Sequence, residues 1–163
     1  MFNLNYRCDF KNGHLRTIQE KDVVLLMSDL IDQDKQYAKD AGYGEDHIQM
    51  ISDVMMNSML GVSIVCKDNI FCSSFGLSKT LQEGVGCIWF LSCNNYFKCL
   101  NNKEAAFEFL KNSKKVLDGF HEIFPILKCY VQSKNKDAKR RTKFMGFEPF
   151  EYGQTFTGYI KNG

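Results

Sequence analysis

Residues Val85 to Ser92 form the segment that most constrains the fold, because they are an almost unbroken run of apolar side chains. A run of this length suits a strand, and a strand without polar alternation is covered on both faces. Two β-prone runs precede it, Val62 to Cys66 and Ile70 to Leu77, and Lys67-Asp68-Asn69 between them predicts a hairpin. The middle of the chain is therefore predicted to be a sheet.

Helical patterns lie on both sides of this sheet segment. Glu20 to Leu30 and Asp46 to Leu60 place apolar residues three and four positions apart, as amphipathic helices do. After the sheet, a long amphipathic helix is predicted between Asn101-Asn102, which can cap it, and Pro125, which stops it. Ile126 to Val131 then has the pattern of another buried strand.

The two ends of the chain complete the order of elements. A first strand is predicted within Arg7 to Ile18, a short basic helix at Lys136 to Met145, and two last strands at Phe147 to Tyr152 and Thr155 to Lys161. The order is strand, two or three helices, three strands, helix, strand, helix, two strands. It predicts an α/β (α+β) fold, with residues 1–163 as a single domain and a mixed central sheet of about six to seven strands flanked by helices on both faces.

Composition narrows the class of protein. The hydrophobic fraction of 44% and the charged fraction of 25% are typical of globular proteins, which excludes a disordered chain. No apolar run approaches the roughly 20 residues of a membrane-spanning helix, and the first thirty residues lack the pattern of a signal peptide. We therefore expect a soluble protein of the cytoplasm.

Seven cysteines are present, and no two form a C-x-x-C pair. Four of them lie in apolar, strand-like runs, where a reduced cysteine packs as a small hydrophobic side chain: Cys66, Cys72, Cys87 and Cys129. We expect reduced packing thiols and no metal site.

Charge is unevenly distributed along the chain. Residues 1–60 carry six Lys or Arg against ten Asp or Glu, although the whole chain has a net charge of +2. The sharpest basic cluster is Lys134 to Lys143, with six positive side chains in ten residues. It is interpreted either as a solvated helix face or as a contact for a phosphate-bearing ligand. No aromatic platform is interleaved with it, so nucleic-acid binding is not expected.

The order of elements is similar to that of the GNAT (Gcn5-related N-acetyltransferase) superfamily, and two local patterns support this. Leu15-Arg16, followed by Asp22 and an apolar helix, resembles the Ile-Arg opening of the family. Val131 to Asn135, then Ala138 and Phe144-Met145-Gly146-Phe147, resembles its penultimate strand, asparagine and helix ending in Gly-Phe.

More narrowly, the chain looks like acetyltransferase-like proteins of tailed phages, including internal virion proteins. The shared features are the polar stretch Asp32 to Ala41, Trp89-Phe90 in the central strand, a closing Phe156-Thr157 strand and a Lys-Asn-Gly end. This resemblance implies a protein of the infected host's cytoplasm or of the virion.

The resemblance to the GNAT superfamily implies an acetyl-CoA site where two parallel strands, here Val85 to Ser92 and Ile126 to Val131, splay apart. The residues implied to contact the cofactor are Phe90, Leu91 and Ser92 on the first strand, Lys98, Asn101, Asn102 and Lys103 after it, and Asn135 at the border. The family's glycine-rich phosphate loop is missing, since Cys93 to Asn102 contains no glycine. Without glycine, a phosphate approaches the backbone less closely.

The catalytic groups of the family are also incomplete. Many members protonate the departing thiolate with a tyrosine four residues before the Gly-Phe glycine, and Thr142 stands at that position. A threonine hydroxyl is far less acidic than a phenol, so Tyr96 is the remaining candidate for the acid. Glu83, just before the central strand, is the candidate for the base that deprotonates the amine.

Two functions are consistent with these patterns. The first is an acyl-CoA-dependent N-acetyltransferase, whose acidic helices between Asp29 and Asp53 would attract a cationic amine acceptor. The second is a non-catalytic protein that keeps the fold and acts by binding a protein partner, as a phage virion or host-interaction protein. The fold alone does not decide between them.

Overall fold

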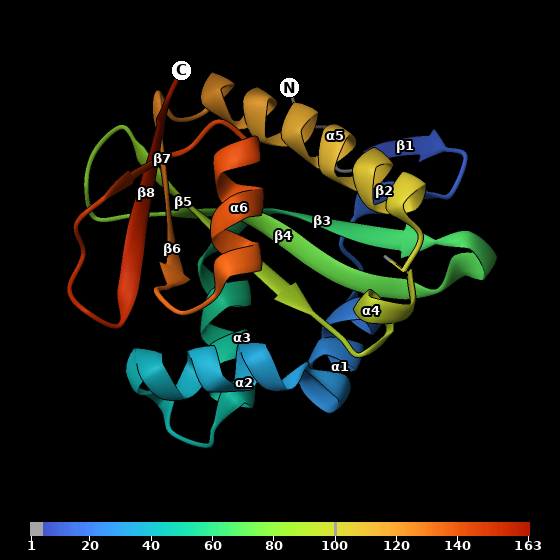
Figure 1. The fold of residues 1–163 in the computed structure, drawn as a ribbon, viewed down its shortest axis with the longest axis horizontal. Coiled ribbons are helices and arrows are strands. Elements are labelled where there is room, and N and C mark those ends of the chain that lie inside the picture. The colour runs from blue at the N-terminus through green and yellow to red at the C-terminus, as the bar shows by residue number, and fades with distance from the viewer. Residues whose placement is uncertain (1–4, 100) are drawn as a thin grey trace.

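A computed structural model describes residues 5–99 and 101–163. Its centre is one mixed sheet of eight strands, in the order β1-β2-β3-β4-β5-β6-β8-β7 (Figure 1). The strands are β1 Arg7–Phe10, β2 Gly13–Thr17, β3 Ser58–Cys66, β4 Phe71–Lys79, β5 Val85–Ser92, β6 Ile126–Gln132, β7 Glu148–Phe150 and β8 Phe156–Asn162.

The helices occupy four stretches of the chain between the strands. They are α1 Glu20–Asp29, α2 Asp32–Ala38, the π-helix η1 Lys39–Tyr43, α3 His47–Asn57, the 3₁₀ helix η2 Lys67–Asn69, α4 Asn95–Cys99, α5 Lys103–Gly119, the 3₁₀ helix η3 Phe120–Glu122 and α6 Lys136–Phe144. None of these helices has both the length and the apolar character that crossing a membrane requires, as far as the described residues show.

The mixed α/β architecture is confirmed, but the expected number of strands was too low. The single strand expected within Arg7 to Ile18 is a hairpin, in which β1 pairs antiparallel with β2. Gly13 starts β2 so close to β3 that a Cβ atom there would collide with the carbonyl oxygen of Val65. This close approach requires glycine at the start of β2.

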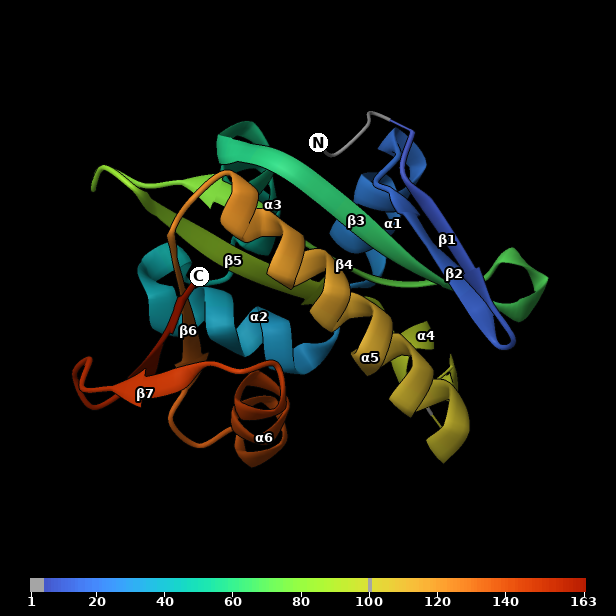
Figure 2. The same ribbon diagram turned by 90° about the horizontal axis from the view of Figure 1, so that it is seen from above.

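Helices cover both faces of the sheet (Figures 1 and 2). On one face α5 packs over a core that includes Leu15, Phe75, Phe109 and Tyr159. On the other face α1, α2 and α3 enclose a second core, which includes Leu26, Met50 and Leu91 among its buried members. The apolar run of β5 is therefore explained by helices on both of its sides.

Helix ends differ from the sequence prediction where strand geometry takes over. The helix expected to run from Asp46 to Leu60 ends at Asn57, because Ser58 to Leu60 belong to β3 and pair with β4. Asp46 caps this helix, since its carboxylate accepts a hydrogen bond of 2.9 Å from the Gln49 N–H. The long helix α5 ends at Gly119, before Pro125, and continues only as a 3₁₀ turn.

The prediction that Cys66 is a reduced packing thiol is wrong. Cys66 forms a disulfide with Cys99 at the end of α4, with a Cα–Cα distance of 6.0 Å. Cys72, Cys87 and Cys129 are free thiols, as expected. The helix α4 was not foreseen, so the sequence spacing gave no reason to bring Cys99 next to Cys66.

A buried ion pair joins the first helix to the sheet. The Asp22 side chain is completely buried and accepts hydrogen bonds from Arg16 Nη1 and Nη2 at 2.6 and 2.8 Å. The Ser63 hydroxyl and the Gln19 N–H donate two more, at 2.7 and 2.9 Å. Burial by itself would raise the pKa of Asp22, but these hydrogen bonds hold it below its usual value. The carboxylate therefore fixes α1 against β2 and β3.

Removing this carboxylate should destabilise the protein strongly. Asp22→Ala leaves a largely buried guanidinium unpaired, and we expect it to lower the free energy of unfolding by about 3–5 kcal/mol in urea denaturation. Asp9→Ala is the matched control, because Asp9 also pairs with an arginine, Arg7, but both side chains are more than half exposed. It should cost less than about 1 kcal/mol. Equal losses in the two variants would contradict this account.

Candidate functional site

The strands β5 and β6 are parallel neighbours that stay paired over only part of their length. Their register runs from Val85↔Ile126 to Cys87↔Lys128 and stops there. Beyond that point β5 remains paired with β4 as far as Ser92, and β6 remains paired with β8 as far as Gln132. We call the unpaired stretch, Ile88–Ser92 facing Cys129–Gln132, the β5–β6 split.

The helix α2 contributes a carboxyl group to the end of this split. The Ser92 N–H donates a hydrogen bond of 2.7 Å to Asp34 Oδ2, and the Ile31 N–H donates one of 3.0 Å to the Ser92 carbonyl. Burial raises the pKa of Asp34 to about 7, against the opposing effects of the Ser92 hydrogen bond and the positive charge of Arg141. Asp34 is therefore partly ionised at neutral pH.

The helix α6 contributes a guanidinium group to the same place. Arg141 lies over two aromatic rings, with its Cζ 5.5 Å from the Phe90 ring centroid and 5.4 Å from that of Tyr96. The two rings meet edge to face, 6.0 Å apart. Burial lowers the pKa of Arg141, and the carboxylate of Asp34 works in the opposite direction. A cation, a carboxyl group and a phenol thus converge at the split.

Several residues predicted from the sequence meet here, and others do not. Phe90 and Ser92 line the split, and Tyr96 contacts Arg141 beside it. Leu91 is buried in the core beneath α1, α2 and α3, so only its backbone can face a ligand. Glu83 is exposed and precedes β5 at the end where β5 and β6 are still paired, away from the split.

The residues at the start of α5 cap that helix, and they bring a negative charge to the place where a phosphate group was expected. Asn102 caps α5, its Oδ1 accepting a hydrogen bond of 2.8 Å from the Glu104 N–H. Glu104 places a carboxylate in the first turn of α5, which repels an anion there. Lys98, Asn101 and Lys103 are exposed.

Two further residues that the resemblance singled out act as helix residues. Asn135 caps α6 by accepting a hydrogen bond of 2.9 Å from the Ala138 N–H. The Thr142 hydroxyl donates a hydrogen bond of 2.8 Å to the Ala138 carbonyl, so it is directed at its own helix. Both side chains are thus engaged within α6.

A shallow pocket of about 330 Å³ lies beside the tip of β6. It is formed by Asp40 and by the β7–β8 connection from Tyr152 to Phe156. Gln132 Nε2 donates a hydrogen bond of 2.6 Å to Asp40 Oδ2, which links this pocket to the end of the split. Hydrogen bonds from Gln132 and Gln36 hold the pKa of Asp40 below its usual value, so the pocket carries a negative charge at neutral pH.

Sequence reasoning missed Asp34 and Arg141. Asp34 belongs to a polar helix and Arg141 to a basic one, and neither pattern indicates burial. Both residues are half-buried and contact β5, although they come from elements far apart in the chain. The only local signal was the position of Arg141, next to the residue that replaces the family's tyrosine.

Comparison with known proteins identifies the fold but no sequence relative. No protein-family model matches the chain, and a search of curated proteins gave no significant match. Among solved structures, the GNAT domain of S. lividans PAT superposes with a TM-score of 0.67 at 11% identity, covering 96% of this chain and 97% of that one. A GNAT-family acetyltransferase from Bacillus anthracis gives 0.60 at 16% identity, over 95% and 96% of the two chains.

A third structure was determined with a ligand. RimL, a ribosomal L7/L12 α-N-protein acetyltransferase in complex with coenzyme A, has a TM-score of 0.57 and 11% identity, over 94% of this chain and 95% of its own. Nearly the whole chain is matched in each case, and the order and direction of β5 and β6 agree with the splayed pair expected from the sequence. The chain therefore has the fold of the GNAT acetyltransferases.

Proposed function

We propose that the protein is an N-acetyltransferase that moves an acetyl group from acetyl-CoA to an amine. The observation that carries this proposal is the β5–β6 split with a carboxyl group of pKa about 7 at its end. The GNAT fold of the chain supports it. Acetyl-CoA would supply the acetyl group as a thioester.

The chain's own residues can serve both proton transfer and charge stabilisation. A carboxyl group with a pKa close to neutral is suited to accept the proton that the amine loses as its nitrogen attacks the thioester carbonyl. Asp34 is therefore our candidate base, in preference to Glu83. The C–S bond breaks with its electron pair on sulfur, and the positive charge of Arg141 would stabilise that thiolate. Tyr96, in contact with Arg141, remains the candidate proton donor.

The pantetheine arm of acetyl-CoA fits the chain better than its phosphate groups do. Next to the split, the Phe90 and Leu91 backbone lies along the stretch of β5 that has no β6 partner, which suits a pantetheine arm. At the phosphate end, Glu104 and the absence of glycine disfavour binding through backbone amides. Lys98 and Lys103 would provide charge there instead, with Asn101 and Asn102 between them. We expect weaker nucleotide binding than a glycine-rich loop gives.

The acceptor is proposed to bind in the pocket beside β6. Asp40 is ionised there, and Tyr152 and Phe156 supply aromatic surface. A carboxylate next to aromatic rings suits a cationic amine. This placement is consistent with the acidic character of the first third of the chain.

A second candidate is a non-catalytic member of the fold, of the tailed-phage type, that acts by binding a protein in the host cytoplasm or the virion. One observation favours it. The N–H and carbonyl of Ser92, predicted to contact pantetheine, are already bonded to Asp34 and Ile31. A ligand would therefore have to displace Asp34 to use the Ser92 N–H.

Titration calorimetry and a thiol-release assay separate the two candidates. We expect acetyl-CoA to bind with micromolar to millimolar affinity, and thiol release to occur with a diamine or a lysine peptide. Arg141→Gln should lower kcat at least tenfold, while Arg140→Gln should not, because Arg140 is exposed and pairs with Asp137. Absence of acetyl-CoA binding at millimolar concentration would reject the enzyme and leave the binding protein.

The proposed base makes a specific prediction for the pH dependence of activity. Thiol release should rise with pH through a midpoint near 7, as Asp34 loses its proton. Asp34→Asn should remove this rise and lower kcat about 100-fold or more. Asp32→Asn, a fully exposed aspartate on the same helix, is the matched control and should keep the wild-type profile. A midpoint that survives in Asp34→Asn would assign the base elsewhere.

The ionisation of Asp34 should also affect the stability of the fold, which should fall over the pH range in which activity rises. The folded-state pKa of Asp34 lies above its unfolded value of about 3.9, so the fold favours the protonated form and loses stability as pH rises from 4 to 7. Asparagine does not ionise. The melting temperature of Asp34→Asn relative to wild type should therefore increase between pH 5 and pH 8, by an amount corresponding to roughly 2 kcal/mol. A difference that is independent of pH would contradict the raised pKa.

A further inference from the structure

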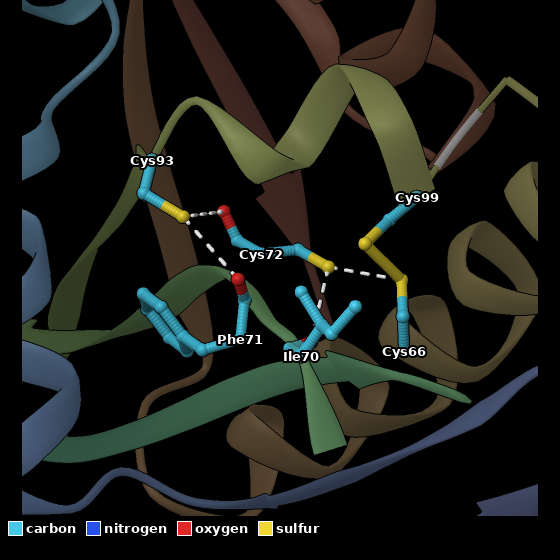
Figure 3. The surroundings of a disulfide bond; sticks show 6 residues. All are labelled: Cys66, Ile70, Phe71, Cys72, Cys93 and Cys99. Carbon is cyan, nitrogen blue, oxygen red and sulfur yellow. Dashed lines mark hydrogen bonds between the residues drawn. A yellow bond between two sulfur atoms is a disulfide. The ribbon is translucent and has the colours of Figure 1, made fainter. Parts of the chain in front are cut away.

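Three cysteine sulfur atoms meet at one point outside the β5–β6 split. Cys66 ends β3, Cys72 lies near the start of β4 and Cys99 ends α4, and their Sγ atoms all lie within 4.8 Å of one another. Cys66 and Cys99 form the disulfide, and Cys72 Sγ lies 2.9 Å from Cys66 Sγ (Figure 3). A free thiol is thus in direct contact with a disulfide.

The short helix α4 is attached to the sheet at both of its ends. At the first end, the Cys93 N–H donates a hydrogen bond of 3.0 Å to the Cys72 carbonyl, and Cys93 Sγ contacts the carbonyls of Phe71 and Cys72 (Figure 3). At the other end the disulfide of Cys99 joins α4 to β3. Tyr96, which contacts Arg141, lies between these two attachments.

The surroundings of the three sulfur atoms disfavour charged thiolates. Cys66 and Cys72 are 8% and 0% exposed, and both belong to the apolar core under α5. Burial raises the pKa of the Cys72 thiol to about 12. A metal would require three thiolates, two of them buried, and within the described residues no fourth side chain completes the set. A disulfide carries no charge and suits this position better.

We propose that Cys66, Cys72 and Cys99 form a thiol–disulfide exchange site, in which Cys66 pairs alternately with Cys99 and with Cys72. The Cys72 thiolate forms a bond to Cys66 Sγ, the Cys66–Cys99 bond breaks, and its electron pair stays on Cys99 Sγ. Cys99 takes up one proton and Cys72 has lost one, so no oxidant or reductant is consumed. Cys99 is partly exposed, so solvent can stabilise it as the leaving thiolate.

The exchange changes how α4 is held. With the Cys66–Cys99 bond, α4 is bonded covalently to β3. With the Cys66–Cys72 bond it loses this link and keeps the contacts at Cys93 and Asn94 and the contact of Tyr96 with Phe90. Because Tyr96 is part of α4, the second state loosens one of the aromatic contacts of Arg141. Since little of Cys72 is thiolate at neutral pH, exchange should take minutes to hours.

The sequence allows the two disulfides to be distinguished directly. Trypsin places the three cysteines in separate peptides, 40–67, 68–79 and 99–103. The full-length protein is oxidised with oxidised glutathione, its free thiols are blocked with N-ethylmaleimide in acid, and the digest is read by mass spectrometry. We expect wild type to give both 40–67 linked to 99–103 and 40–67 linked to 68–79. Cys72→Ser should give only the first pair and Cys99→Ser only the second.

Hydrogen exchange then tests the consequence for α4. Amides of residues 95–99 should exchange at least tenfold faster in Cys99→Ser than in Cys72→Ser. Cys8→Ser, which removes a cysteine outside the cluster, should match wild type.

Three results would overturn the proposal. The first is a wild-type digest with only the 40–67 and 99–103 linkage together with two free thiols in Cys99→Ser. The second is a set of three free thiols with zinc bound in native mass spectrometry. The third is an equal rate of α4 exchange in the two serine variants.

Discussion

The separation of β5 from β6 after three paired residues is the constraint on which the rest of the site depends. Backbone groups of a strand inside a sheet need partners, and beyond Cys87 the next strand no longer supplies them. At Ser92 the partners come from the junction of α1 and α2. The Asp34 carboxylate accepts from the Ser92 N–H, and the Ile31 N–H donates to the Ser92 carbonyl. The helix α6 brings Arg141 to the same opening. The groups of the proposed site, Asp34, Tyr96 and Arg141, therefore come from three distant helices and meet because two strands diverge.

The charge asymmetry of the sequence acquires a structural meaning at this point. Asp34 comes from the acidic first third and Arg141 from the basic cluster, and each affects the ionisation of the other. The remaining charges of the basic helix are spread differently. Arg140 pairs with Asp137, and Lys139 donates to the Ser133 carbonyl.

Local patterns in the sequence predicted the elements well, whereas contacts across the fold were out of their reach. The apolar run of β5, the Lys67-Asp68-Asn69 hairpin and the Asn102 cap depend on neighbouring residues, and the structure contains all three. Asp34 was missed because its burial results from packing against β5. The Cys66–Cys99 disulfide was missed for the same reason, since no pattern of spacing indicates that α4 returns to the end of β3. Asn102 was predicted as a cap and as a ligand contact, and its side chain is used for the cap.

The bond between Ser92 and Asp34 also bears on the order in which the molecule assembles. The helices α1 and α2 are made early, but the backbone groups that hold their junction belong to the end of β5, and Leu30 pairs with Cys93 in the same region. These contacts join residues far apart in the chain, and such contacts form late because closing a long loop costs entropy. Arg141 arrives later still. A nascent chain that ends before α6 contains β1 to β6 but lacks β8, the strand that pairs with β6, and Arg141, so the surroundings of Asp34 are completed only by the last part of the chain.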